Sequence, residues 1–137
     1  MPGLLLADPS DVGELCVDLS AAGPEVLDTL HESLLAEDGR ERLLALLSSM
    51  DRRESLQVDE AAVRLDPGRA GVVPRTYVRL PADRALSPVL QDRFIAEADA
   101  ATPGNPFTVV DMASSHLGVL LNPDPLAEVL STRPVSP

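Results

Sequence analysis

The sequence predicts an α/β protein with a helical N-terminal half, residues 1–72, followed by a strand-helix-strand-helix segment, residues 73–137. In the first half, apolar residues recur at intervals of three and four, which is the period of an amphipathic helix. After Pro74 the pattern changes to two short β-prone runs, 75–80 and 107–112, separated by another helical stretch. The 137 residues, 45% of them apolar, have the size of one domain and can form a core.

The N-terminal half is predicted to contain a helical hairpin. Residues 1–22 hold several turn signals around a short extended run, and we expect an irregular arm there. A first helix should begin at Pro24, a favoured first helical residue, and end near residue 36. Asp38 and Glu41 have the spacing of a capping box for a second helix, which continues to Met50.

The C-terminal half is predicted to alternate strands and helices. Ser87 and Pro88 should start the helix between the two strands, and Asn122 with Pro123 should start the last helix. The four apolar positions expected on the buried face of the middle helix are Leu90, Phe94, Ile95 and Ala98. A strand, a helix and a second strand in this order normally form a right-handed crossover, so we expect the two strands to be parallel neighbours.

Charge and composition exclude several classes of protein. The net charge of −11 disfavours binding to nucleic acid or to an anionic membrane surface. No signal peptide and no run of membrane-spanning length is recognisable, so we expect a cytoplasmic protein with no membrane partner. The single cysteine, Cys16, cannot form an internal disulfide or a metal site alone, and we expect a small buried apolar role for it. No cofactor and no metal is expected.

A residue suited to acid-base chemistry follows each predicted strand. Asp83 comes three residues after the run 75–80, and His116 comes four residues after the run 107–112. Neighbouring parallel strands end at the same edge of a sheet, about 4.8 Å apart, so the two side chains should emerge side by side. In such a pair the carboxylate fixes the imidazole tautomer, and the other ring nitrogen can accept a proton. Spacing alone also allows a capping aspartate and a solvated histidine.

Several short segments of the C-terminal half resemble the last third of the α/β-hydrolase superfamily, in particular its small esterase, methylesterase and hydroxynitrile-lyase branch. The segments that carry this resemblance are 74–80, 83–86, 90–91, 114–117 and 123–127. The resemblance implies that Asp83 is the acid and His116 the base of a Ser-His-Asp triad that hydrolyses a small-molecule ester. It also implies that residues 4–9 and the paired helices correspond to the lid of such an enzyme.

The nucleophile of such a triad is missing from this sequence. The Gly-x-Ser-x-Gly elbow that presents the serine does not occur in the 137 residues. We therefore expect a truncated or split hydrolase that is inactive alone, with an N-terminal hydrolase half or a second copy of the chain as its partner. Ser114 and Ser115 lie in the loop of the histidine itself and are expected to bond loop backbone. His31, beside Glu32 on the first helix, is expected to face solvent.

Two other functions remain open from the sequence. The chain could be a non-catalytic interaction module that binds a protein through its helices and an exposed strand edge, because two strands alone seldom form a stable sheet. Alternatively, a nucleophile-free enzyme could use the pair of Asp83 and His116 as a general base on a bound substrate.

Overall fold

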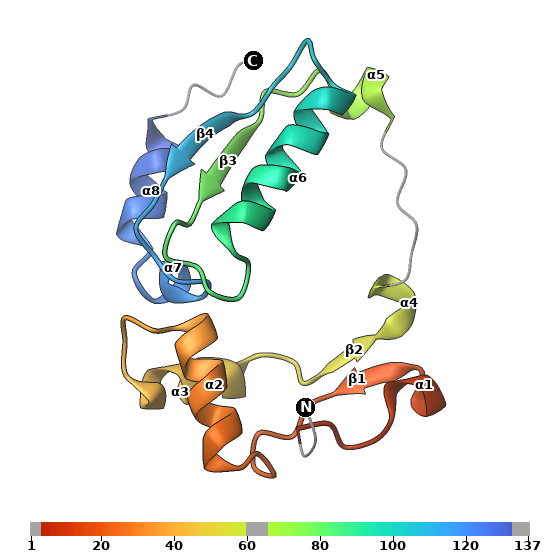
Figure 1. The fold of residues 1–137 in the computed structure, drawn as a ribbon, viewed down its shortest axis with the longest axis vertical. Helices are drawn as coiled ribbons and strands as arrows, with labels where there is room; N and C mark the ends of the chain where they lie inside the picture. Colours follow the sequence, from red (N-terminus) through yellow and green to blue (C-terminus); the bar gives the residue numbers. More distant parts are fainter. Residues whose placement is uncertain (1–3, 60–65, 133–137) are drawn as a thin grey trace.

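The computed structural model describes residues 4–59 and 66–132 (Figure 1). Its helices and strands follow one another along the chain as α1 (Pro9–Val12), β1 (Glu14–Cys16), α2 (Pro24–Leu34), α3 (Arg40–Ser49), β2 (Arg53–Ser55), α4 (Leu56–Asp59), α5 (Pro67–Ala70), β3 (Thr76–Arg79), α6 (Pro88–Ala101), β4 (Thr108–Asp111), α7 (Gly118–Leu121) and α8 (Asp124–Ser131). In the described ranges β1 pairs with β2 and β3 pairs with β4. The mixed α/β content that the sequence predicts is therefore confirmed.

A small antiparallel ribbon lies in the N-terminal half. In this ribbon Leu15 of β1 stands opposite Glu54 of β2, and Arg53 forms an ion pair with Glu14. β1 overlaps the extended run expected within residues 1–22. β2 is a strand that the sequence did not predict, because its three residues are all polar and exposed and therefore show no alternation of apolar and polar side chains.

The helical hairpin is present as predicted, with corrected ends. α2 ends at Leu34, two residues before the expected end, and α3 begins at Arg40. The expected capping box does not form, because Gly39 is the residue before the helix and no side chain caps it. Asp38 instead accepts a hydrogen bond from the backbone N–H of Gly39 at 2.7 Å and pairs with Arg42 one turn into the helix.

The strands β3 and β4 are parallel neighbours, as predicted. Their register runs from Thr76 opposite Thr108 to Arg79 opposite Asp111. The helix α6 connects them, and its first turn is capped by the Ser87 hydroxyl. Figure 1 shows α6 beside β3, with α8 on the other side of the strand pair, beside β4. Both strands run in the same direction, with their ends toward the α2–α3 hairpin (Figure 1).

An aromatic and cationic cluster holds the beginnings of these two strands together. The guanidinium of Arg75 lies 4.3 Å from the centre of the Phe107 ring, and the ring of Phe107 meets that of Tyr77 edge to face with the centroids 5.7 Å apart. Arg75 also donates hydrogen bonds to Thr102 and to the carbonyl of Asn105. The loop that leads from α6 into β4 is thereby fixed to the start of β3.

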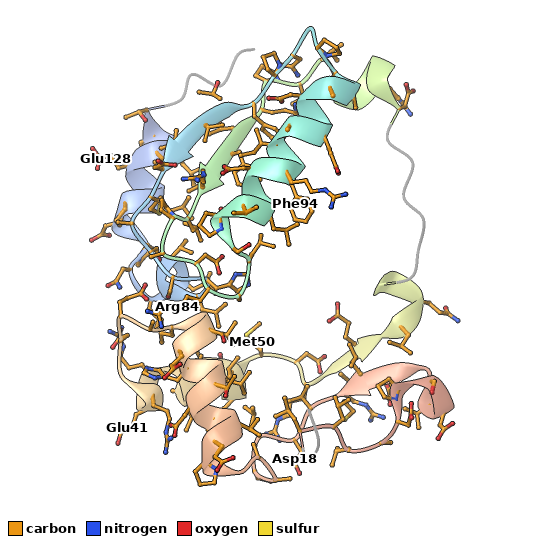
Figure 2. All side chains as sticks on the ribbon, viewed as in Figure 1. Asp18, Glu41, Met50, Arg84, Phe94 and Glu128 are labelled. Atoms are coloured by element: carbon orange, nitrogen blue, oxygen red, sulfur yellow. The ribbon has the colours of Figure 1, made fainter. Side chains whose placement is uncertain are left out.

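The inner face of α6 differs from the face predicted from its apolar residues. Phe94 was expected to be buried, but it is 44% exposed, and Figure 2 shows it on the outer side of the helix. Gln91, a polar residue, is buried in its place at 1% exposure. Two strands form a sheet too narrow to cover the whole apolar face of a helix, so a flank of α6 stays in solvent.

Gln91 is buried because its amide bonds the backbone at the end of β3. Its Oε1 accepts from the N–H of Leu80 at 2.9 Å, and its Nε2 donates to the carbonyls of Leu80 at 3.0 Å and Leu86 at 2.8 Å. The two carbonyls flank the loop that carries Asp83. One side chain of α6 thus ties both ends of this loop to the helix.

The last two helices differ from the sequence prediction. The last helix, α8, starts at Asp124 with Pro123 before it, rather than at Asn122 and Pro123. The short helix α7 was not predicted, because its four residues are too few to show a helical period. Among the residues described, no helix is long and apolar enough to cross a membrane.

We predict that Gln91→Ala lowers the free energy of unfolding by about 2 to 4 kcal/mol, since it removes packing and leaves the part-buried N–H of Leu80 without its acceptor. Chemical denaturation measures this change. Gln57→Ala, at an exposed position of α4, is the matched control and should alter stability very little. A Gln91 variant as stable as that control would show that the amide contacts do not hold this loop.

Candidate functional site

The loop after β3 presents a buried carboxylate. Asp83 stands four residues after Arg79, the last residue of β3, and is 4% exposed. Its Oδ1 accepts hydrogen bonds from the backbone N–H groups of Ala85 and Leu86, both at 2.8 Å. These two bonds compensate for burial of the charge and fix the carboxylate so that Oδ2 faces the neighbouring loop.

His116 lies in that neighbouring loop, five residues after Asp111, the last residue of β4. Its Nδ1 is 2.9 Å from Oδ2 of Asp83, so an Nδ1–H donates to the carboxylate. The side chain of His116 is 39% exposed, whereas that of Asp83 is 2% exposed. Within the described residues Nε2 of His116 has no hydrogen-bond partner. The structure therefore brings together the two residues that the sequence placed at one sheet edge.

This arrangement is suited to proton transfer. A buried carboxylate bonded to Nδ1 holds the imidazole in the tautomer whose Nε2 carries a lone pair, and it stabilises the imidazolium that forms when Nε2 accepts a proton. The exposed side of the ring can then meet a hydroxyl, a water molecule or a substrate. We call the bonded pair of Asp83 and His116 the dyad.

The end of the helix α2 contacts the histidine loop directly. The carbonyl of Leu34 accepts hydrogen bonds from the hydroxyl of Ser115 at 3.1 Å and from the N–H of Leu117 at 2.8 Å. Oε1 of Glu37 accepts from the N–H of Ser115 at 2.8 Å and from the hydroxyl of Ser114 at 3.4 Å. The α2–α3 hairpin is thus bonded to the loop on both sides of His116 in the sequence.

The other candidate residues have structural contacts. Ser114 donates to the carbonyl of Ser115 at 3.0 Å, as expected for a serine that bonds its own loop, whereas Ser115 reaches across to α2. The expectation that His31 faces solvent is wrong, since its Nε2 lies 2.6 Å from the carbonyl of Asp38 and the residue is half-buried. Because α2 ends early, the chain folds back over His31. Cys16, expected to be buried, is only half-buried in β1 and is free.

Two titratable groups near the dyad, Tyr77 and Glu37, have shifted pKa values. Burial and the charges of Asp83 and Asp92 raise the pKa of Tyr77, so its hydroxyl stays neutral. Partial desolvation alone would raise the pKa of Glu37, but hydrogen bonds from Ser115 and Ser114 outweigh it, and the net shift is downward. Glu37 therefore meets the loop as an anion.

A shallow hollow lies where the hairpin meets the two loops. The residues that line it come from the segment between α2 and α3 and from both loops, and they are Ala36, Glu37, Ala82, Arg84, Ala113, Ser114 and Ser115. In Figure 2 Arg84 lies at this junction between α2 and the loops. A separate apolar cleft lies between the hairpin and the N-terminal segment, and Leu30, Leu47 and Met50 are among the residues that line it.

Glu37 and Gly118 belong to this site but were not found from the sequence. Glu37 contacts residues almost eighty positions away, and an acidic residue after a helix has no distinguishing pattern. Gly118 lies so close to the hairpin that a Cβ there would overlap the carboxylate of Glu37 and the hydroxyl of Ser114. A glycine soon after a histidine loop was the available signal, because glycine marks a close approach of two segments.

The chain matches no known family model and no curated protein with which it was compared. Within the ranges 4–59 and 66–132, no three His, Cys, Asp or Glu residues are grouped so that they could hold a metal ion.

We predict that Gly118→Ala loosens the hairpin from the histidine loop, because the added methyl group displaces the flexible carboxylate of Glu37. The amide proton of Ser115 should exchange faster with solvent, while the free energy of unfolding falls by only about 1 kcal/mol. Gly104→Ala is the matched control, since a Cβ at Gly104 meets open space. An unchanged exchange rate at Ser115 would contradict the close approach.

The lowered pKa of Glu37 predicts an acid-sensitive contact. Because the folded-state pKa lies below the ordinary value of 4.5, the unfolded state binds the proton more readily and stability rises with pH in this window. The stabilisation that wild type has over Glu37→Gln should be fully present above that value and should fade as the pH falls below it. Denaturant titrations from about pH 6 to about pH 3 measure the difference. A difference that does not change with pH would mean that the carboxylate charge contributes nothing.

Proposed function

We propose that this chain provides the acid and the base of an α/β-hydrolase-like site that hydrolyses small carboxylic esters. Asp83 is the acid and His116 the base. A serine nucleophile and an oxyanion hole come from a polypeptide segment outside these 137 residues, with the character of an N-terminal hydrolase half. Without that segment the chain is inactive as an esterase, because neither the nucleophile elbow nor its backbone donors are present in the sequence.

One observation carries the proposal: the hydrogen bond of 2.9 Å between Nδ1 of His116 and the buried carboxylate of Asp83. Two further features support it. The pair lies at the edge where parallel strands end, which is where α/β proteins collect their functional groups. The helical hairpin lies over this edge, as the lid does in the superfamily that the sequence resembles.

The proposed reaction follows from the roles of the two residues. Nε2 of His116 removes the proton from the incoming serine hydroxyl, whose oxygen attacks the ester carbonyl carbon, and Asp83 stabilises the imidazolium that results. The imidazolium then gives its proton to the departing alkoxide, which leaves as an alcohol. Water, deprotonated by the same nitrogen, attacks the acyl-serine and releases the carboxylic acid. The proton returns to the serine oxygen.

Reconstitution with a candidate N-terminal half tests this proposal. The chain is co-expressed with a segment that bears a Gly-x-Ser-x-Gly elbow, and hydrolysis of a p-nitrophenyl ester is followed. We expect turnover by the complex, with His116→Ala or Asp83→Asn lowering kcat by about 10³-fold or more.

The matched control in this assay is His31→Gln, which changes the other histidine of the chain and keeps a hydrogen-bond donor toward Asp38. It should retain turnover. A complex that assembles but hydrolyses no ester would refute the catalytic proposal. Turnover that survives loss of His116 would refute the assignment of the base.

A second candidate function is a non-catalytic interaction module. The exposed apolar side chains favour it, since Val89 at the start of α6 is 78% exposed and Val72 before β3 is 71% exposed. In this case the dyad has no role in binding. Complex formation that is unaffected by Asp83→Asn, with no ester hydrolysis by any variant, would favour this function over the first.

A further inference from the structure

We propose that Glu37 is a positioning residue through which the α2–α3 hairpin sets the orientation of His116. The proposal deepens the function above and rests on it for its catalytic consequence. Its structural content is independent of that function, because it concerns only how the histidine loop is held against Asp83.

Both backbone neighbours of His116 are bonded to the hairpin. On one side, the N–H of Ser115 donates to Oε1 of Glu37 at 2.8 Å. On the other side, the N–H of Leu117 donates to the carbonyl of Leu34 at 2.8 Å. The backbone on either side of the imidazole is therefore held by the hairpin. The direction of the ring depends on where the hairpin lies.

The hydrogen bond between the N–H of Ser115 and Glu37 has a charged acceptor. A hydrogen bond from a backbone N–H to a carboxylate is shorter and roughly twice as strong as one between neutral groups. Ser115 is 1% exposed, so its N–H cannot exchange Glu37 for water without opening the loop. Leu35, between the two hairpin acceptors, is fully buried and anchors this turn. Glu37 is thus the charged member of an otherwise neutral set of contacts.

Gly118 leaves the space in which the carboxylate of Glu37 lies, and a side chain there would overlap it. The same oxygen also meets the hydroxyl of Ser114. The loop therefore holds the carboxylate mainly through the N–H of Ser115, one residue before the histidine, and leaves room for it at Gly118.

The position of the hairpin therefore affects the orientation of the His116 ring. If the hairpin moves away, the N–H of Ser115 loses its acceptor, and the loop is free to turn the imidazole away from Asp83. Misplacement of a catalytic group by about 1 Å can cost about 100-fold in rate. An open hairpin would admit substrate but leave the base poorly oriented, and its closure would restore both contacts.

Nitrogen NMR of the His116 ring in the full chain tests the proposal. Long-range ¹H–¹⁵N spectra distinguish the Nδ1–H tautomer from the Nε2–H tautomer. Wild type should show mainly the Nδ1–H form. Glu37→Ala should lose that preference and give a mixture, whereas Glu37→Gln should keep it, because the amide oxygen still accepts from Ser115. Glu32→Ala, which removes an exposed carboxylate from α2, the helix that precedes Glu37, should resemble wild type.

Two outcomes would overturn the proposal. The first is a Glu37→Ala chain that is folded by circular dichroism and yet keeps the wild-type tautomer. The second applies if the Glu37→Ala chain does not fold. In that case Gly118→Ala, which displaces the same carboxylate, serves as the test variant, and an unchanged His116 tautomer in it would overturn the proposal. A change in tautomer in either variant supports the proposal, because a purely stabilising contact would leave the ring of a folded chain unaltered.

The reconstituted complex separates this proposal from the proposed function. If the complex hydrolyses ester, Glu37→Ala should lower kcat by about 100-fold, and Glu37→Gln should recover most of it. If no complex hydrolyses ester while the tautomer still depends on Glu37, the positioning role stands and the esterase proposal fails. If ester is hydrolysed equally with and without the Glu37 side chain, the esterase proposal stands and the positioning role of Glu37 fails.

Discussion

The parallel register of β3 and β4 is the constraint on which the site depends. Asp83 and His116 are thirty-three positions apart in the sequence, and each lies in the loop that follows one of these two strands. Because Arg79 stands opposite Asp111, the loops that follow the two strands begin side by side. A slip of one residue in this pairing would turn one strand's side chains to the opposite face and would move its loop along the edge.

Polar side chains form a large part of the buried interior. Among the described residues, three apolar side chains are buried, namely Leu35, Leu43 and Met112. The buried polar residues are Asp83, Gln91, Ser114 and Ser115, and all four lie in the two loops or bond them. Buried polar groups are tolerated only when their hydrogen bonds are made, and each of these four has partners. Among the described residues, the least exposed polar side chains are therefore Asp83 of the dyad and three residues in or bonded to its two loops.

The fold could be predicted from the sequence where local signals are strong. The crossover of β3, α6 and β4 followed from β-prone runs, a capping serine and the handedness rule, and Asp83 and His116 were placed together on that basis. Features that depend on long-range contacts could not be predicted from the sequence. Gln91 looks like a surface residue until its partners at Leu80 and Leu86 are known, and Glu37 has no local signal at all. The capping box of Asp38 failed because Gly39 takes that position.

A double-mutant cycle between Asp83 and His116 tests the central claim most directly. Each residue is replaced by alanine singly and together, and the free energies of unfolding are compared, so that the bonds of Asp83 to Ala85 and Leu86 cancel. With the two side chains hydrogen-bonded, we expect a coupling energy of about 0.5 to 1.5 kcal/mol. Strictly additive effects of the two substitutions would contradict the dyad, and with it the proposed role of this chain as the acid and base of a hydrolase.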